Sequence, residues 1–395
     1  MRHANRKILL AAAAGALLAA ALVALDGPGP STPVAGSAVS TVDSLRPGKR
    51  SERPAEPKPV HASGEVPCAA ASEALTTRQQ LAQLVMVGVP GNAEAASKIV
   101  REHQVGGVFA HASPVKLLAN GGLAKVRGAA RIPLTVAIDE EGGRVQTIDP
   151  LAGSMPSARR MAATMTPEQV KAKAADRGRF LHEAGVTMNF APVVDVTGKP
   201  AGTVIGDRSF SADPRTAKQY AAAFAAGLSS AGVFPVLKHF PGHGSADSDS
   251  HKQSAVTSPL AQLEAVDLVP YRGLADYGPT AVMLGHLVVP GLTGQEPATL
   301  SPAAYQLLRT RFQFDGLAVT DDLGAMRAVT DRYDLPEAVL RAIAAGADVA
   351  LWSSGARIGE VLDRLEKAVR SGELPAERVR DALRHVLISK NLCIS

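Results

Sequence analysis

The sequence contains few cysteines: Cys68 and Cys393 are the only two among 395 residues. No cysteine lies near the N-terminus, which excludes lipid attachment to an N-terminal cysteine. Disulfides form in exported proteins, and these two residues enclose almost the whole folded part of the chain. They are therefore either one long-range bridge or two unrelated thiols, one of them near the C-terminal end.

The chain also lacks an excess of charge of one sign once its first 67 residues are set aside. Eight of the 42 Lys and Arg residues and five of the 37 Asp and Glu residues lie in 1–67, which leaves 34 basic and 32 acidic residues in 68–395. A nucleic-acid-binding protein concentrates basic side chains on one face. The nearly neutral body therefore argues against binding to nucleic acid.

The N-terminus has the order of residues that is typical of an export signal. Three basic residues, Arg2, Arg6 and Lys7, precede the apolar run 8–25. Because 18 alanine-rich residues are a marginal length for a spanning helix, an uncleaved membrane anchor is the alternative to a cleaved signal peptide at 1–25. Residues 26–67 lack aromatic residues and are rich in Pro, Ser and Gly, which predicts a flexible linker. We expect an exported protein, released or anchored, with its folded domain at 68–395.

From Cys68 onward, short apolar runs alternate with amphipathic, alanine-rich segments. This alternation predicts parallel strands that are covered by helices on both faces. Strands are predicted at 84–89, 106–110, 134–138, 188–194, 233–237, 280–284, 316–319 and 348–352. Eight such units fit a (β/α)8 barrel of the TIM type as a single α/β catalytic domain. A doubly wound sheet is the alternative, but the expected Gly-rich phosphate turn after the first strand is missing.

Helices are predicted between the strands, for example at 167–184, 214–231, 302–312 and 336–345. Three of them begin at a proline that directly follows a capping residue: Thr166-Pro167, Asp213-Pro214 and Ser301-Pro302. A capping side chain before proline at the first helical position marks a helix start. Because a closed barrel places its first and last elements side by side, this fold favours a disulfide between Cys68 and Cys393.

Polar residues follow five consecutive predicted strands, the third to the seventh. They are Asp139, Glu140 and Glu141, then Asp195, then Lys238 and His239, then His286, and finally Asp321 and Asp322. Each position alone could be a satisfied buried polar group. In a barrel, however, the C-terminal ends of all strands meet at one rim, where barrel enzymes place their sites. The repeated placement therefore predicts one active site.

The segment 238–251, KHFPGHGSADSDSH, holds three histidines and two aspartates in 14 positions. One interpretation is a metal site, whose candidate ligands are His239, His243, Asp249 and His251. Pro241 and Gly242 disfavour the helix that a zinc-binding histidine pair at i and i+4 requires. A structural loop is the second interpretation. The third, which we favour, is acid–base catalysis by Asp249 and His251, because a carboxylate fixes the tautomer of an imidazole and raises its basicity.

An acid–base group needs a partner, and Asp321 at the end of the seventh predicted strand is placed to be a carboxylate nucleophile on a rigid element. A nucleophile on a strand end opposite a mobile acid–base group is the arrangement of a double-displacement glycosidase. Because the usual pair is two carboxylates, a histidine in the proton-transfer role departs from that rule.

Five motifs occur in order along the chain: DEEGGRVQ (139–146), NFAPVVDV (189–196), IGDRSF (205–210), the segment 238–251, and TDDLGAM (320–326). With these motifs the chain resembles, over roughly residues 70–390, the family 3 glycoside hydrolases. The resemblance is to the single-domain β-N-acetylglucosaminidases of bacterial cell-wall turnover.

The resemblance implies a role for each matching residue. Asp321 would be the nucleophile, and Asp249 with His251 would form the acid–base dyad, His251 being the proton donor. The residues that would hold the terminal sugar are Asp139, Arg208, Lys238 and His239. Two positions depart from the family pattern: Thr147 stands where relatives often have arginine, and Glu140 where they often have glutamine, which adds negative charge near the rim.

The resemblance further implies an exo-acting, retaining β-N-acetylglucosaminidase that acts on muropeptides or related glycans without a cofactor or metal. We expect a monomer that touches a membrane only through an N-terminal anchor. One alternative is a phosphorylase, because a histidine acid–base admits a phosphate anion that a carboxylate would repel. The other is a catalytically silent sugar-binding protein of the envelope, which would need neither the nucleophile nor the dyad.

Overall fold

A computed structural model describes residues 67–111, 114–249 and 255–394. The export signal or anchor predicted at 1–25 lies outside the described residues, as does the linker predicted at 26–67 except for its last residue. Both stay predictions. Among the described helices, none is both long enough and apolar enough to span a bilayer.

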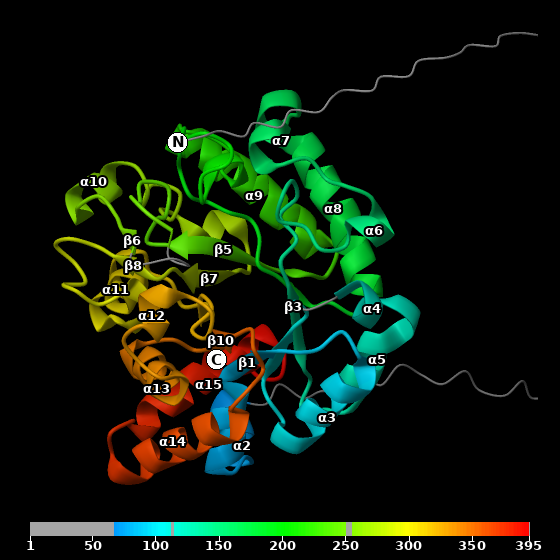
Figure 1. The fold of residues 1–395 in the computed structure, drawn as a ribbon, viewed down its shortest axis with the longest axis vertical. Coiled ribbons are helices and arrows are strands. Elements are labelled where there is room, and N and C mark those ends of the chain that lie inside the picture. Colours follow the sequence, from blue (N-terminus) through cyan, green and yellow to red (C-terminus); the bar gives the residue numbers. More distant parts are fainter. Residues whose placement is uncertain (1–66, 112–113, 250–254, 395) are drawn as a thin grey trace, which may run out of the picture. The chain divides into compact units, whose positions relative to one another are not determined.

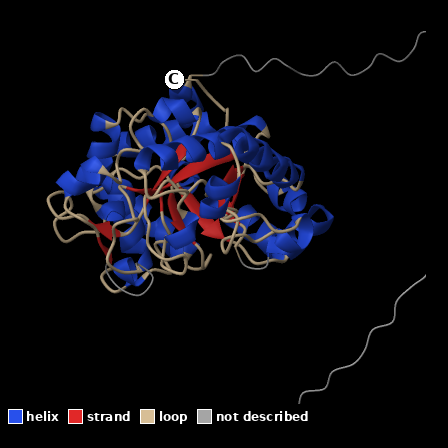
Figure 2. Cartoon of the chain, turned by 90° about the horizontal axis from the view of Figure 1, so that it is seen from above, coloured by secondary structure: helices blue, strands red, loops and turns tan. Residues whose placement is uncertain are grey.

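Eight parallel strands form the barrel that the alternating pattern predicts. They are β1 (Val85–Gly88), β2 (Gly107–Phe109), β3 (Thr135–Ile138), β4 (Met188–Asn189), β5 (Phe234–Phe240), β7 (Ala281–Leu284), β9 (Ala318–Thr320) and β10 (Ala350–Trp352). Their order in the sheet is β10-β1-β2-β3-β4-β5-β7-β9. Figure 2 shows these strands in red at the centre, with the helices in blue around them. The (β/α)8 TIM-type barrel is confirmed.

The barrel closes between β9 and β10, where backbone hydrogen bonds join the two ends of the row of strands. The Asp348 amide donates to the Ala318 carbonyl oxygen (2.9 Å), and the Thr320 amide donates to the Val349 carbonyl oxygen (3.0 Å). The Thr320 hydroxyl also accepts a hydrogen bond from the Leu351 amide (2.9 Å). The C-terminal ends of all eight strands therefore surround one rim.

Helices cover the outside of the barrel (Figure 1). The longer ones are α3 (Ala93–His103), α8 (Pro167–Glu183), α9 (Pro214–Ser230), α13 (Leu335–Ala345), α14 (Ile358–Ser371) and α15 (Ala376–Ser389). The shorter ones are α1 (Cys68–Glu73), α2 (Thr77–Gln83), α4 (Pro114–Leu118), α5 (Gly122–Gly128), α6 (Asp149–Ala152), α7 (Ala158–Thr164), α10 (Leu260–Ala265), α11 (Pro302–Gln306) and α12 (Arg327–Thr330). Each long helix buries an apolar stripe, as α14 does with Val361, Leu362 and Leu365.

Two of the three predicted helix starts are capped as their sequences suggest. The Thr166 hydroxyl accepts a hydrogen bond from the Gln169 amide at the start of α8, and Asp213 accepts one from the Thr216 amide (2.8 Å) at the start of α9. The Ser301 side chain, by contrast, caps no amide of the described chain at the start of α11. The helix predicted at 302–312 is also not continuous, because α11 passes into a π-helical turn, Leu307–Arg311.

β4 is shorter than predicted and β5 is longer. The predicted strand 188–194 ends at Asn189, and Pro192, in the rest of the predicted range, has no amide proton to donate to a neighbouring strand. Pairing with β5 resumes in a single bridge between Val193 and Lys238. β5 was predicted to end at Leu237, but it continues to Phe240, so Lys238 and His239 lie within the strand rather than after it.

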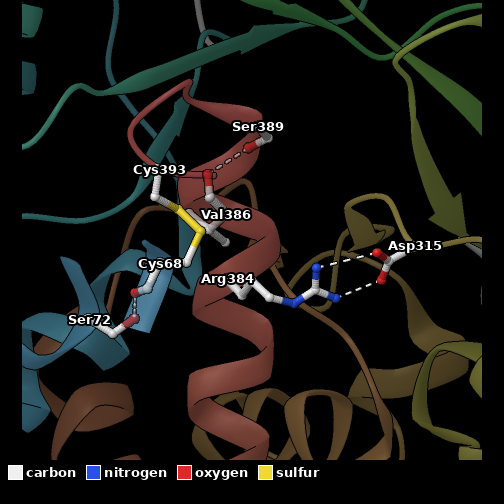
Figure 3. Close-up of a disulfide and its surroundings, with 7 residues drawn as sticks. All are labelled: Cys68, Ser72, Asp315, Arg384, Val386, Ser389 and Cys393. Atoms are coloured by element: carbon white, nitrogen blue, oxygen red, sulfur yellow. Dashed lines mark hydrogen bonds and ion pairs between the residues drawn. A yellow bond between two sulfur atoms is a disulfide. The ribbon is translucent and has the colours of Figure 1, made fainter. Parts of the chain in front are cut away.

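A disulfide joins Cys68, at the start of α1, to Cys393, which follows α15, and the expected bridge is thereby confirmed (Figure 3). The two Cα atoms lie 4.9 Å apart across 325 residues of sequence. The backbone supports the same contact, because the Cys68 amide donates to the Ile394 carbonyl oxygen (3.2 Å). The start of α1 is therefore held against the segment that follows α15.

A small parallel sheet of β6 (Ala255–Val256) and β8 (Leu287–Val288) lies beside the main barrel. It holds the loop 241–249 in place, because the Asp247 amide donates to the Val256 carbonyl oxygen (3.0 Å). In return, the Val256 amide donates to Asp247 Oδ1 (3.0 Å). The C-terminal part of this loop is thus held by hydrogen bonds to a strand outside the loop.

Candidate active site

The polar residues that were predicted to share the rim come together around an ion-pair network. Lys238 Nζ lies 2.6 Å from Asp139 Oδ1 and 2.6 Å from Glu141 Oε1. Arg208 makes a two-pronged contact with the same glutamate, with both N···O distances at 2.8 Å. Two of the four predicted sugar-binding residues, Lys238 and Arg208, therefore contact Glu141 directly, and Asp139 joins them through Lys238. Glu141 was not assigned a role from the sequence.

This network is charged at neutral pH although most of it is buried. Burial alone would raise the pKa of Glu141, but the adjacent Arg208 and Lys238 charges lower it to about 2. Burial would lower the pKa of Lys238, and the carboxylates of Asp139 and Glu141 more than offset that, so the pKa is raised. The same balance raises the pKa of Arg208. The rim therefore offers fixed cations and a half-buried carboxylate, Asp139, to a polyhydroxylated ligand.

His239, the fourth predicted sugar-binding residue, is held by Asp195. The ring Nδ1 lies 2.7 Å from Asp195 Oδ2, and the His239 amide donates to Asp195 Oδ1 at 3.3 Å. The other ring nitrogen, Nε2, lies 3.4 Å from Arg208 Nη2. His239 thus connects the ion-pair network to the segment that follows β4.

Asp321 is placed directly after β9 and is half-buried at the rim. Burial alone would raise the pKa of this carboxyl. The nearby His286, His239 and Lys238 side chains, together with a hydrogen bond from the Asp322 amide to Asp321 Oδ1 (2.9 Å), hold the pKa below its usual range. Asp321 is therefore a carboxylate, which is the state that a nucleophile requires.

The neighbouring aspartate has a different environment. Asp322 Oδ1 accepts a hydrogen bond from the Gly324 amide (2.8 Å), and its Oδ2 accepts one from the Ser353 amide (3.2 Å). His286 Nε2 lies 2.9 Å from the Asp322 carbonyl oxygen and therefore donates to it. Asp322 ties the loop after β9 to the loop after β10, so its carboxylate supports the turn that carries Asp321.

Only one half of the predicted acid–base dyad can be described. Asp249 lies on the wall of a cavity of about 560 Å³ that opens beside the rim, with Arg144, Lys199 and His243 among its lining residues. His251 lies outside the described residues, so its role and its pairing with Asp249 stay predictions. The loop before them is anchored, because Lys199 Nζ donates to the Ala246 carbonyl oxygen (2.6 Å).

Glu140 is a correction to the expectation of added negative charge near the rim. Its side chain is fully buried, and Arg177 Nη1 lies 3.3 Å from its Oε1. Its Oε2 accepts hydrogen bonds from the amides of Thr147 (2.8 Å) and Ile148 (3.3 Å). Burial raises the pKa of Glu140, and Arg177 and the two amides offset this only in part. The side chain braces the turn after β3. Thr147, in turn, donates from its hydroxyl to the Asp139 carbonyl oxygen (3.2 Å).

The candidate metal ligands of the loop do not form a cluster in the described part of the chain. His239 Nδ1 is already bonded to Asp195. The described residues that do bring three ligand atoms within 4.8 Å of one another are Asp348, Asp381 and His385, near the N-terminal end of β10. Arg309 and Arg378 bind Asp348 there, at 2.6 and 2.8 Å, so cations of the protein already neutralise that carboxylate.

Sequence reasoning missed two residues that organise the site, Glu141 and Asp195. Both were among the polar strand-end residues, but neither was given a role. The sequence indicated both residues only through their motifs, since Glu141 lies in 139–146 and Asp195 in 189–196. What the sequence did not display was the partner, since Arg208 lies 67 residues from Glu141 and His239 lies 44 residues from Asp195.

A (β/α)8 barrel with an ionised carboxylate on one strand end, facing a set of fixed cations and carboxylates at the same rim, is the framework of a glycoside hydrolase. Comparison with known proteins gives the family. The model of the glycosyl hydrolase family 3 N-terminal domain matches residues 76–388, and the chain belongs to this family.

Several relatives cover most of the chain. Beta-hexosaminidase LpqI of Mycobacterium tuberculosis is 51% identical over 312 residues, which span 77% of this chain and 80% of the relative. The crystal structure of a GH3 glycosyl hydrolase from Mycobacterium smegmatis matches with a TM-score of 0.78 at 50% identity, over 80% of this chain and 98% of that one. A GH3 β-N-acetylglucosaminidase from Paenibacillus matches with a TM-score of 0.75 at 32% identity, over 80% of this chain and 62% of that one.

Proposed function

We propose that the protein is a retaining exo-β-N-acetylglucosaminidase that releases non-reducing terminal β-linked N-acetylglucosamine from muropeptides or related glycans. The observation that carries the proposal is the ionised Asp321 carboxylate at the end of β9, at the same rim as the network of Asp139, Glu141, Arg208 and Lys238. The names of the relatives, a β-hexosaminidase and a β-N-acetylglucosaminidase, support the choice of sugar.

In the first chemical step, Asp321 attacks the anomeric carbon of the sugar. A bond forms between that carbon and a carboxylate oxygen, and the bond to the leaving oxygen breaks. His251, oriented by Asp249, gives its proton to the leaving oxygen. Asp139, Arg208, Lys238 and His239 hold the sugar hydroxyls during this step, because their charges and hydrogen-bonding groups are fixed before the substrate arrives.

In the second step, water replaces the carboxylate. His251, now neutral, takes a proton from the water molecule, whose oxygen bonds to the anomeric carbon while the bond to Asp321 breaks. Two inversions at one carbon return the β-anomer. The dyad is thereby restored to its starting protonation state.

The proposal is tested by following hydrolysis of 4-nitrophenyl N-acetyl-β-glucosaminide and of a purified N-acetylglucosaminyl muropeptide. The matched control is 4-nitrophenyl β-glucoside, which lacks the acetamido group. We expect turnover of the first two substrates, much slower turnover of the glucoside, and β-N-acetylglucosamine as the first anomer seen by proton NMR. Release of the α-anomer would overturn Asp321 as nucleophile, and preference for the glucoside would overturn the sugar assignment.

The same experiment separates hydrolysis from the phosphorylase alternative. Time courses are run with and without inorganic phosphate, and the products are separated. We expect free N-acetylglucosamine under both conditions. N-acetylglucosamine 1-phosphate as the main product in phosphate would replace the hydrolase by a phosphorylase.

We also propose that the protein works outside the cytoplasm. The disulfide between Cys68 and Cys393 supports this, because structural disulfides persist in oxidising compartments. The export signal expected at 1–25 points the same way. Fractionation of cells that express the full chain should place the activity in the envelope or the medium, and activity confined to the cytoplasm would contradict export.

A further inference from the structure

Asp195 is a buried carboxylate whose bonds reach two separate parts of the 238–251 segment. Its Oδ2 pairs with the ring of His239 (2.7 Å). Its Oδ1 accepts hydrogen bonds from the His239 amide (3.3 Å) and from the His243 amide (2.7 Å). The residue itself is fully buried just beyond β4. One side chain therefore holds the end of β5 and the start of the loop that leads to Asp249.

These contacts determine which ring nitrogen of His239 carries the proton. A carboxylate oxygen can only accept, so Nδ1 of the neutral ring is the donor and Nε2 has the lone pair. Arg208 Nη2, which can only donate, lies 3.4 Å from Nε2. Both neighbours of the ring therefore favour the same tautomer, and the ring is oriented from two sides.

A buried carboxylate needs compensation, and the hydrogen-bond and ion-pair partners of the Asp195 carboxylate among the described residues lie in this segment. Its ion-pair partner there is His239, and no described lysine or arginine pairs with it. Burial would raise the pKa of Asp195, but the rings of His239 and His243 and the His243 amide lower it. Removing the whole carboxylate would thus leave the histidine ring and two amides without their acceptor.

We propose that Asp195 is a positioning residue of the glycosidase: it fixes His239 in the Nδ1–H tautomer that faces Arg208, and it anchors the backbone of His243 from which the acid–base loop departs. The inference rests on the proposed function for its kinetic consequences. The orientation of the ring, however, can be measured without any substrate.

The decisive variant is Asp195→Asn, which keeps the shape of the side chain but can present an N–H to His239. The ring must then accept at Nδ1 and place its proton on Nε2, opposite a guanidinium that also donates. We expect kcat/KM for 4-nitrophenyl N-acetyl-β-glucosaminide to fall about 10–100-fold, as is typical when the group that orients a functional histidine is replaced. We also expect KM to rise, because the sugar loses an oriented partner.

The matched control is Asp348→Asn near the opposite end of the barrel. Asp348 is also fully buried and also bonds a histidine ring, with His385 Nδ1 at 3.1 Å. Thermal unfolding should show that this variant is destabilised at least as much as Asp195→Asn. Besides the bond to a histidine, Asp348→Asn loses the ion pairs of Asp348 with Arg309 and Arg378. Its kcat/KM should nevertheless change less than about 2-fold. A mutation distant from the rim that shares no partner with it acts independently of the residues there.

Two further measurements keep the test independent of folding and of activity. In the nitrogen NMR spectrum of histidine-labelled protein, His239 is assigned by its loss in His239→Gln, and we expect a protonated Nδ1 in the wild type and a protonated Nε2 in Asp195→Asn. In the His239→Gln background, Asp195→Asn should raise KM less than about 2-fold, because its effect on sugar binding passes through that ring.

A wild-type His239 protonated on Nε2 would overturn the proposal, and so would unchanged kinetics in a folded Asp195→Asn. An effect on KM that is fully additive with His239→Gln would also overturn it, because the ring would then not be the intermediary. If the wild-type protein hydrolyses no β-N-acetylglucosaminide, the proposed function fails instead, and the NMR tautomer still decides the role of Asp195.

Discussion

Asp321 and Asp322 are adjacent carboxylates that follow β9 and have different surroundings. Asp322 uses both oxygens to accept backbone amides, from Gly324 and Ser353. Asp321 accepts the Asp322 amide and otherwise feels the charges of His286, His239 and Lys238. The proposed mechanism gives the chemistry to Asp321 and the support of the turn to Asp322, so the two residues are a matched pair for mutation.

At this scale we predict that Asp321→Asn abolishes turnover and that Asp322→Asn does not. Without the Asp321 carboxylate no covalent glycosyl-enzyme forms, so kcat should fall below a few per cent of the wild-type value. Asp322→Asn keeps an oxygen for the Gly324 amide and should cost stability, on the order of 1–3 kcal/mol, with most of kcat retained. The measurement is steady-state hydrolysis of an aryl N-acetyl-β-glucosaminide alongside thermal unfolding. The reverse ranking of the two variants would make Asp322 the nucleophile.

The loop 241–249 is the element on which the proposed proton transfer depends. It begins with the His243 amide bound to Asp195 and passes the Ala246 carbonyl, which accepts from Lys199. It is then tied to Val256 of β6 through Asp247. Asp249 follows two residues later on the wall of the adjacent cavity. The loop is thus anchored along its length by residues outside it, up to the point where the dyad begins.

A prediction for this element concerns His251 and depends on the leaving group. With an activated aryl glycoside, His251→Ala should still form the glycosyl-enzyme, whereas with a sugar aglycone it should be slower by about 10²–10⁴-fold. Asp249→Ala should show the same pattern more mildly. Pre-steady-state release of the aryl group, with intact-protein mass to detect intermediate on Asp321, checks this.

Asp247 supplies the control for that experiment. It is an exposed carboxylate two residues before Asp249, and its structural bond is to the Val256 amide. Asp247→Asn preserves that acceptor and should react with good and poor leaving groups in the wild-type ratio. Equal losses on both leaving groups in His251→Ala, together with a leaving-group effect in Asp247→Asn, would transfer the acid role to Asp247.

Asp267, which packs against Gly242 of the same loop, leads to a prediction about the pH dependence of stability. Burial and the Asp195 charge raise the pKa of Asp267 from 3.8 to about 7, and hydrogen bonds from Ser245 oppose this only in part. A Cβ on Gly242 would lie 2.4 Å from the Asp267 side chain, so the carboxyl lies directly under the loop. Because its folded pKa is raised, Asp267 contributes most to stability below pH 3.8 and loses that contribution as the pH rises to about 7.

Asp267→Asn imitates the protonated carboxyl at every pH. We therefore expect its free energy of unfolding to be close to that of the wild type at pH 4, and to exceed it at pH 8 by on the order of 4 kcal/mol at most. Urea unfolding of both proteins at the two pH values measures the difference. A variant that is less stable than the wild type at pH 8 would mean that the ionised carboxylate is the stabilising form.

At the scale of the whole molecule, two kinds of contact join parts that are distant in the sequence. Hydrogen bonds between β9 and β10 complete the ring of strands, and the disulfide joins α1 to the segment after α15. Figure 3 shows this covalent contact beside α15, where Arg384 also binds Asp315. Ser389, Lys390 and Asn391, just before Cys393, line a pocket together with the N-terminal ends of β3 and β5, at the end of the barrel opposite the rim. This position indicates a structural role for the disulfide.

We predict that a Cys68→Ser/Cys393→Ser variant loses about 2–5 kcal/mol of stability, because the bridge closes a long loop in the unfolded chain. Its kcat/KM at 25 °C should stay within about 2-fold of the wild-type value. Ser389→Ala, at the end of the same helix, is the control and should change stability by less than about 0.5 kcal/mol. Urea unfolding of the three proteins is the measurement. Unchanged stability of the serine variant would show that the barrel needs no covalent closure.

The sequence by itself determined the order of the strands and helices, the barrel, and the strand ends at which the site is built. These features depend on local signals: apolar runs of strand length, capping residues before proline, and polar residues that recur after consecutive strands. Because a parallel barrel brings equivalent strand ends to one rim, local position was enough to place Asp139, Lys238, His239 and Asp321 at one site.

Tertiary structure alone decided the pairing of side chains across that rim. The extension of β5 through Phe240 depends on its pairing with β7, where Phe240 lies opposite Leu284, and on the bridge between Val193 and Lys238. The burial of Glu140 depends on Arg177, and the charge of Glu141 on Arg208 and Lys238. Such contacts join residues from distant motifs, and their strength depends on distances and burial that no local pattern of residues encodes.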